Sequence, residues 1–182
     1  NLNGTKVGKG YSPYLVAEVS ANHNGNFENA RKLIKLAKES GADALKLQTY
    51  RADTITLNSN NNDFKINVGA WSGQTSYELY DKAHTPWEWH EPLFTYANQL
   101  EIDIFSSPFD ETAVELLEKL KVPFYKIASF EAVDIPLIEC VALTNKPVII
   151  STGMANKDEI AEAVEVLRQN GSGDIILLHC IS

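Results

Sequence analysis

Residues 125–131, with the sequence YKIASFE, begin as an apolar strand and end as a cluster of polar groups. Strand geometry places Lys126 on the face opposite Tyr125 and Ile127. A lysine on an apolar strand carries a large desolvation cost unless its charge meets a partner. The same arrangement recurs along the chain: an apolar strand with a polar end, followed by an amphipathic helix. Such repetition predicts a barrel with a site at one mouth.

Five further apolar segments have the length and composition of strands. They are predicted at residues 14–19, 44–49, 102–106, 147–151 and 175–179. Most of the segments between the strands have apolar residues at helical spacing. Helices are predicted at residues 27–40, 86–100, 112–120, 135–143 and 157–169. Asp134 is expected to cap the fourth of these, and Asn156 with Glu159 the fifth. Crossover helices between successive strands imply parallel pairing with right-handed connections.

Two connections are less regular. Residues 6–11 are predicted to form a short hairpin around a glycine-rich turn. Residues 50–85 form a long connection with an asparagine run and a short helix predicted at 76–82. Long loops in compact domains are usually functional or disordered, and the aromatic residues here argue against disorder.

The strand and helix pattern predicts an α/β fold, for which two architectures are considered. One is the N-terminal part of a (β/α)₈ TIM barrel, with about six β/α units in residues 1–182; a complete barrel of this class needs roughly 250 residues. The other is a complete, doubly wound open sheet of flavodoxin type. Lysine and glutamate side chains along the strand interiors favour the barrel, because in an open sheet those faces would lie under helices.

Composition narrows the class of protein. The chain has 16 basic and 24 acidic residues and a net charge of −8, which disfavours nucleic acid as a partner. No apolar run is long enough to span a membrane, and no signal peptide is recognisable. The two cysteines fit free thiols in a reducing compartment, so a cytoplasmic location is expected. Walker A, Gly-x-Gly-x-x-Gly and Cys-x-x-Cys motifs are absent from the sequence.

Polar side chains gather at the C-terminal ends of the predicted strands, which a barrel would bring to one mouth. They are Glu18, Ser20, Lys46, Gln48, Ser106, Ser107, Lys126, Ser129, Glu131, Ser151, Thr152 and His179. Two lysines with neighbouring hydroxyls suit a phosphorylated or carboxylated small molecule. The two carboxylates are candidate acid/base groups. His179 fits a core histidine, a metal ligand or a base. Of the other histidines, His23 is expected to cap its loop, and His84 and His90 to lie at the surface or at a helix start.

Six segments that contain these strand ends together resemble the sialic acid synthase family. They span residues 17–25, 46–49, 105–110, 125–131, 151–154 and 177–180, in the family's order and across most of the chain. Within the family, residues 48–50, the segment around Trp71 and residues 85–90 are most similar to the branch that makes pseudaminic acid.

The resemblance implies a transferase on a (β/α)₈ barrel that condenses phosphoenolpyruvate with an acetamido sugar. For the pseudaminate branch the sugar is 2,4-diacetamido-2,4,6-trideoxy-L-altrose, and the products are a nine-carbon acid and phosphate. N-Acetylneuraminate or legionaminate synthesis is the alternative within the family. A divalent metal, Mn²⁺ or Mg²⁺, is expected to polarise the sugar aldehyde.

The resemblance also assigns roles residue by residue. It places Lys46, Lys126, Ser129 and Ser151 around phosphoenolpyruvate, and Ser107 where relatives often carry threonine. His179 matches one of two metal histidines. Glu18 and Glu131 match active-site carboxylates whose roles the sequence leaves undivided. Gln48 and Asn22 match positions near the sugar.

Relatives continue past the segment of His179 with two more barrel units, a second metal histidine and a C-terminal antifreeze-like (SAF) domain. That domain supplies an arginine to the partner subunit's site, so a homodimer is implied for a full-length protein. The 182 residues alone are therefore expected to be an incomplete catalyst. Two other functions stay open: a Schiff-base aldolase with Lys126 or Lys46 as nucleophile, and a non-catalytic module that binds phosphoenolpyruvate.

Overall fold

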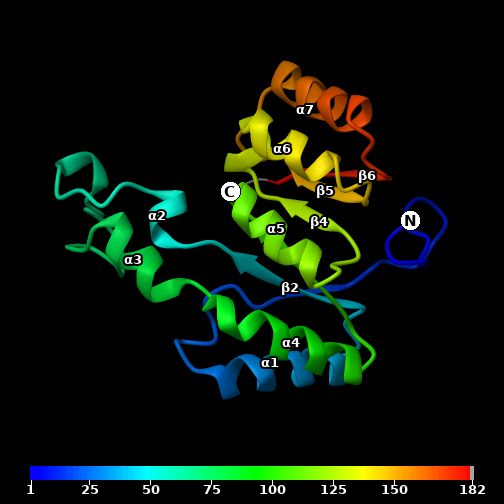
Figure 1. Cartoon of the computed structure of the whole chain (residues 1–182), viewed down its shortest axis with the longest axis horizontal. Helices are drawn as coiled ribbons and strands as arrows, with labels where there is room; N and C mark the ends of the chain where they lie inside the picture. The colour runs from blue at the N-terminus through cyan, green and yellow to red at the C-terminus, as the bar shows by residue number, and fades with distance from the viewer. Residues whose placement is uncertain (181–182) are drawn as a thin grey trace.

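The computed structural model describes residues 1–180, which form one six-stranded parallel sheet flanked by helices (Figure 1). The strands are β1 (Val16–Glu18), β2 (Ala44–Thr49), β3 (Asp103–Pro108), β4 (Tyr125–Ile127), β5 (Val148–Ser151) and β6 (Ile175–Leu178). The helices are α1 (Phe27–Glu39), α2 (Ala52–Ile55), α3 (Ser76–Ala83), α4 (Trp87–Gln99), α5 (Glu111–Lys119), α6 (Ile135–Ala142) and α7 (Lys157–Gln169). Two 3₁₀ turns, η1 (Asn62–Phe64) and η2 (Phe130–Val133), complete the set.

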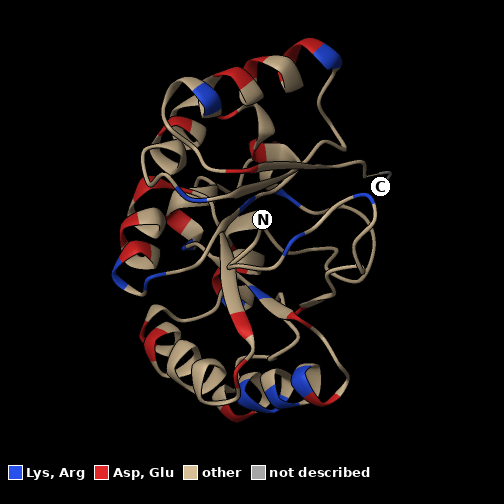
Figure 2. Ribbon diagram, turned by 90° about the vertical axis from the view of Figure 1, so that its right-hand side faces the viewer, with Lys and Arg blue, Asp and Glu red and all other residues tan. Residues whose placement is uncertain are grey.

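The strands lie in the sheet in the order in which they occur in the sequence, β1 to β6. A flavodoxin-type sheet has the strand order 2-1-3-4-5, in which the first strand lies between the second and the third. The observed order differs, so that alternative is wrong. The helices form an outer arc around the strands, and most of the charged residues lie on these helices (Figure 2). The strands thus form a half-barrel, as predicted. In the part of the chain that is described, no helix is long and apolar enough to cross a membrane.

The barrel interior is closed at the N-terminal end of the strands. Phe105, Phe124 and Ile149 pack there with Leu2, which is only 3% exposed. Tyr14 holds this N-terminal segment in place, because its hydroxyl donates a 2.5 Å hydrogen bond to Asp103 Oδ2. Apolar side chains therefore fill the bottom of the half-barrel and leave the polar groups to the opposite mouth.

Helices α6 and α7 begin at the side-chain caps that the sequence predicted. Asp134 accepts a hydrogen bond from the backbone N–H of Leu137 at the start of α6. Asn156 and Glu159 form a reciprocal capping box at the start of α7, as predicted. Each cap satisfies backbone donors that the first helical turn leaves unpaired.

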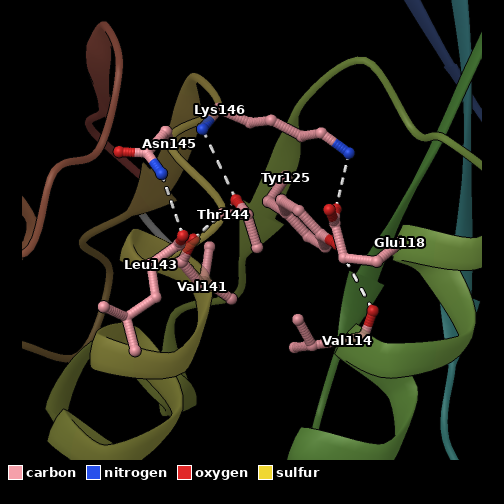
Figure 3. A network of polar contacts seen from close by, with 8 residues as sticks. All are labelled: Val114, Glu118, Tyr125, Val141, Leu143, Thr144, Asn145 and Lys146. Carbon is pink, nitrogen blue, oxygen red and sulfur yellow. Dashed lines mark hydrogen bonds and ion pairs between the residues drawn. The ribbon is translucent and has the colours of Figure 1, made fainter.

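The outer face of β4 is fixed to its neighbours by one polar network (Figure 3). The buried hydroxyl of Tyr125 donates to Glu118 Oε1 of α5 at 2.7 Å. Lys146, in the loop before β5, donates to the same oxygen at 2.5 Å. The network holds the outer face of β4, a strand of only three residues, against α5. Successive side chains of a strand point to opposite faces, so Lys126, next to Tyr125, faces the barrel interior.

Two predictions about local structure need correction. The turn at residues 8–11 forms, but the nearby backbone bridge joins Leu2 to Thr5, so the hairpin predicted at 6–11 is wrong. Glycines supply the turn, whereas the bridge lies where Leu2 is buried. Helix α3 confirms the short helix predicted in the long connection, and backbone bonds between Ile66 and residues 73–74 add a small hairpin there.

His90 lies in the first turn of α4, at a helix start as expected, but it is fully buried and not at the surface. Its Nε2 lies 2.8 Å from Thr49 Oγ1, which lies 2.7 Å from Ser106 Oγ. Thr49 and Ser106 are on the outer faces of β2 and β3. Burial lowers the pKa of His90 to about 4, so the ring is neutral at pH 7. The network joins the first turn of α4 to the ends of two strands that carry site residues.

We expect Thr49→Val to lower the free energy of unfolding by about 1–3 kcal/mol, because the substitution removes one hydroxyl and leaves His90 and Ser106 buried with one fewer partner. Urea denaturation measures the effect. Thr95→Val, at an exposed position on α4, is the matched control and should change stability by less than about 0.5 kcal/mol. Equal effects of the two substitutions would show that the network contributes nothing.

Candidate functional site

Lys126 is a buried cation whose contacts are neutral. Only 7% of the residue is exposed. Its Nζ donates to the carbonyl oxygen of Ile127 at 2.7 Å and to Ser151 Oγ at 2.6 Å. Burial and the nearby charge of Lys46 lower its pKa to about 8. Neither hydrogen-bond partner carries a negative charge, so a bound anion could neutralise the ammonium group of Lys126.

Lys46 lies on the same inner face, one strand from the barrel edge. It stands in register with Glu18 of β1, and its Nζ lies 2.5 Å from Glu18 Oε2. Two positions further along β2, Gln48 Oε1 accepts a 3.0 Å hydrogen bond from Ser20 Oγ. The ends of β1 and β2 thus carry one lysine, one carboxylate and one amide toward the mouth.

Ser107 adds a hydroxyl between the two lysines. It pairs with Gln48 in the β2–β3 register, and Phe105, two residues earlier, packs in the barrel interior. Ser107 is 1% exposed, and its Oγ has no hydrogen-bond partner within the described residues. Buried hydroxyls in native proteins are nearly always satisfied. A ligand oxygen or water at this mouth would satisfy Ser107.

Glu131 occupies the 3₁₀ turn that follows β4. Its Oε2 is buried and is another of the side-chain oxygens without a partner among residues 1–180. Burial raises the pKa of its carboxyl, and the neighbouring Asp134 raises it further, while Lys126 acts in the opposite direction. Burial therefore favours the protonated form, which can donate a proton.

Ser129 lies just past the end of β4, and Ser151 is the last residue of β5. Ser129 Oγ accepts a 3.3 Å hydrogen bond from the backbone N–H of Gly153. A Cβ at position 153 would lie 3.1 Å from that Oγ and 3.2 Å from Cys180 Cβ. Glycine thus allows the β5 loop to approach the serine closely.

Gly153→Ala should displace Ser129 and weaken binding of an anionic ligand by about tenfold, which corresponds to roughly 1.4 kcal/mol. The backbone at Gly153 has no positive φ, so we expect little change in thermal stability. Calorimetric titration with phosphoenolpyruvate measures the first effect. Gly69→Ala, at an open turn with φ +79, should show the reverse: unchanged binding and a small loss of stability.

Glu18, Lys46, Lys126 and Glu131 lie on or just past β1, β2 and β4, close enough for the other three charges to shift the pKa of Lys126. Asn22 is exposed in the loop after β1, and His179 is exposed just past β6. Residues 1–180 contain no group of three or more His, Cys, Asp or Glu side chains that could hold a metal ion. The described residues therefore do not form a complete metal site, and His179 alone offers an imidazole from the predicted set.

The structure gives Ser20 and Gly153, both near the predicted strand ends, defined contacts at the mouth. Ser20 has φ +46, and its backbone N–H donates to Glu18 Oε1 at 3.2 Å. The sequence places Ser20 at a strand end, but its left-handed conformation and its contact with Glu18 depend on the folded loop. Also, His23 caps its loop as expected, since its Nδ1 accepts from the N–H of Gly25.

Comparison with known proteins identifies relatives of this chain. The NeuB family model matches residues 33–182. Pseudaminic acid synthases from Helicobacter pylori and Campylobacter jejuni are 50% and 45% identical to it, each over 93% of this chain. An N,N'-diacetyllegionaminic acid synthase from C. jejuni is 36% identical. The chain spans about half the length of these curated relatives.

Among solved structures, N-acetylneuraminic acid synthetase from Leptospira borgpetersenii, in complex with citrate, superposes with a TM-score of 0.85 at 28% identity. The match covers all of this chain and 59% of that one. The Bacillus subtilis spore coat polysaccharide biosynthesis protein SpsE gives a TM-score of 0.80 at 31% identity, over 48% of its length. The chain therefore belongs to the NeuB family, which confirms the resemblance predicted from its strand-end motifs.

Proposed function

We propose that this chain carries the phosphoenolpyruvate site of a pseudaminic acid synthase, which condenses phosphoenolpyruvate with 2,4-diacetamido-2,4,6-trideoxy-L-altrose to give pseudaminate and phosphate. The buried Lys126, with its neutral contacts at the barrel mouth, is the observation that carries this proposal. The choice of sugar is supported by identities of 45–50% to pseudaminic acid synthases against 36% to a legionaminic acid synthase.

Phosphoenolpyruvate would lie between the two lysines, with hydroxyl donors on either side. Lys126 and Lys46 supply charge, while Ser151, Ser129 and the unpaired Ser107 supply hydrogen bonds. Hydrogen bonds from ammonium groups to phosphate or carboxylate are about twice as strong as neutral ones. Asn22 follows β1 and Gln48 lies near the end of β2, and we place the sugar there.

The carbon–carbon bond forms when the C2–C3 π electrons of phosphoenolpyruvate attack the sugar aldehyde. The aldehyde oxygen takes up a proton, and water adds at C2 and gives one up. The tetrahedral intermediate then breaks the bond between C2 and the phosphate oxygen, and the new hydroxyl passes its proton to the departing phosphate as the C2 carbonyl forms. Of the assigned residues, His179 is the one that the resemblance gives to the expected Mn²⁺ or Mg²⁺, and the roles proposed for the other residues do not depend on the metal.

The environments of the two carboxylates divide the proton transfers between them. Glu131 is partly buried with a raised pKa, so we propose it as the donor to the aldehyde oxygen. Glu18 is half-exposed and paired with Lys46, so it is an anion suited to accept the proton of the water. A panel of the three acetamido sugars, each mixed with the full-length protein, phosphoenolpyruvate and manganese, tests the assignment. Phosphate release with the altrose derivative alone supports it, and release only with N-acetylmannosamine or with the legionaminate precursor contradicts it.

The affinity for phosphoenolpyruvate should fall as pH rises through about 8. Below that pH Lys126 is protonated in the free protein and can hold the anion; above it, binding must also recruit a proton. We expect Kd to be flat from pH 6.5 to 7.5 and to rise by up to about tenfold per pH unit above 8. Calorimetry across this range measures the profile. Lys126→Arg keeps its charge and, if it binds, should not show the rise.

One observation favours a Schiff-base aldolase as a second candidate. A lysine with a pKa of about 8 has an unprotonated fraction that can attack a carbonyl. Borohydride with pyruvate would then leave a covalent adduct on Lys126. The synthase needs no such adduct, so mass spectrometry of the treated protein separates the two functions.

A further inference from the structure

Glu18 occupies the position beside Lys46 that an anionic substrate would need. The two residues are aligned in the register of β1 and β2, and their side chains meet at 2.5 Å. Lys46 is largely buried, with 14% of its side chain exposed, whereas the Glu18 side chain is 47% exposed. The lysine is thus fixed within the barrel, and the carboxylate is the partner that can leave toward solvent.

The loop after β1 holds the carboxylate on the lysine. The backbone N–H of Ser20 donates to Glu18 Oε1 at 3.2 Å, while Glu18 Oε2 faces Lys46. Ser20 adopts φ +46, a left-handed conformation that is uncommon for residues other than glycine. Its hydroxyl bonds Gln48, which ties this conformation to β2. The loop therefore positions the carboxylate and the amide together.

The mouth of the free protein has more positive than negative charge. Lys46 and Lys126 are cations, Glu18 pairs with Lys46, and burial favours the neutral form of Glu131. A multiply charged anion placed beside Lys46 would meet Glu18 at close range, and like charges at such a distance repel strongly where water is scarce. Binding therefore requires Glu18 to move or to become neutral.

We propose that Glu18 is a built-in competitor for the anion site, which phosphoenolpyruvate must displace from Lys46 before the carboxylate can act on water. The inference rests on the proposed function and adds an order of events. The anion binds first, and its binding frees the base. Before the anion arrives, Glu18 is engaged with Lys46 and is not available to activate water.

Glu18→Gln tests the proposal, because it keeps the size of the side chain and removes the competing charge. Isothermal titration with phosphoenolpyruvate and with inorganic phosphate should show about three- to tenfold tighter binding than in the unmodified protein. Glu39→Gln is the matched control. It removes the same charge from an exposed pair with Lys35 on α1 and should leave both affinities unchanged.

A second measurement needs no substrate. Acetic anhydride labelling of the ligand-free protein, read by mass spectrometry, should modify Lys46 faster in Glu18→Gln. Equal or weaker anion binding by this variant, with unchanged labelling of Lys46, overturns the competitor role and leaves the proposed function standing. Tighter binding of phosphate, with no binding of phosphoenolpyruvate by either protein, supports the competitor and overturns the proposed function.

Discussion

Replacing Lys126 by methionine should abolish measurable binding of phosphoenolpyruvate while leaving the protein folded. The residue is buried at the mouth, and its ammonium is the central donor of the proposed anion site. Loss of one charged partner from a desolvated pair costs about 2–5 kcal/mol, which raises Kd roughly 30-fold to several thousandfold. Stability should stay constant or rise, because a buried cation is exchanged for an apolar side chain of similar length. Calorimetry and thermal unfolding measure the two effects.

Lys146→Met is the control on the opposite face of β4. Lys146 bonds Glu118 in the network that anchors Tyr125, away from the mouth (Figure 3). Its loss should lower stability by up to about 1 kcal/mol, as for other partly exposed ion pairs, and should not change phosphoenolpyruvate affinity. Normal binding by Lys126→Met would show that the anion lies elsewhere.

Replacing Glu131 by glutamine should lower turnover by about 10²- to 10⁴-fold while phosphoenolpyruvate still binds. The amide has the same shape as the protonated carboxyl but cannot deliver a proton to the aldehyde oxygen. Burial already favours the neutral form of Glu131, so glutamine should be accepted without a large loss of stability. Steady-state phosphate release by the full-length protein measures turnover, and calorimetry measures binding.

Glu139→Gln provides the comparison for that experiment, because Glu139 is an exposed glutamate on α6. It should leave both turnover and binding unchanged. Full turnover by Glu131→Gln would remove Glu131 from the proton-transfer steps. Loss of binding without loss of turnover at saturating substrate would give it a binding role instead.

Much of the fold could be predicted because it depends on local pattern. Alternation along residues 125–131 placed Lys126 opposite Tyr125, and the structure has the lysine inside and the tyrosine against α5. Sequential β-α units were enough to predict parallel strands, and the polar faces of the strands favoured a barrel over an open sheet. The structure and the related solved structures confirm both.

What the sequence missed depends on contacts between distant segments. His90 is buried with its ring against the hydroxyl of Thr49, which lies 41 positions earlier in the sequence, on β2. Likewise, the pairing of Glu18 with Lys46 depends on the register of β1 against β2, which neither segment specifies alone. Ser151 could be named as a site residue, but its hydrogen bond to Lys126 arises from the way β4 and β5 lie side by side.

Positional ¹⁸O labelling tests the central claim most directly. Phosphoenolpyruvate labelled in the oxygen that bridges C2 and phosphorus is mixed with the purified full-length protein, 2,4-diacetamido-2,4,6-trideoxy-L-altrose and manganese. We predict that ³¹P NMR will find the label in the released phosphate, because water adds at C2 and the C2–O bond breaks. Label retained in the keto acid, or no phosphate released with any acetamido sugar, would contradict the account.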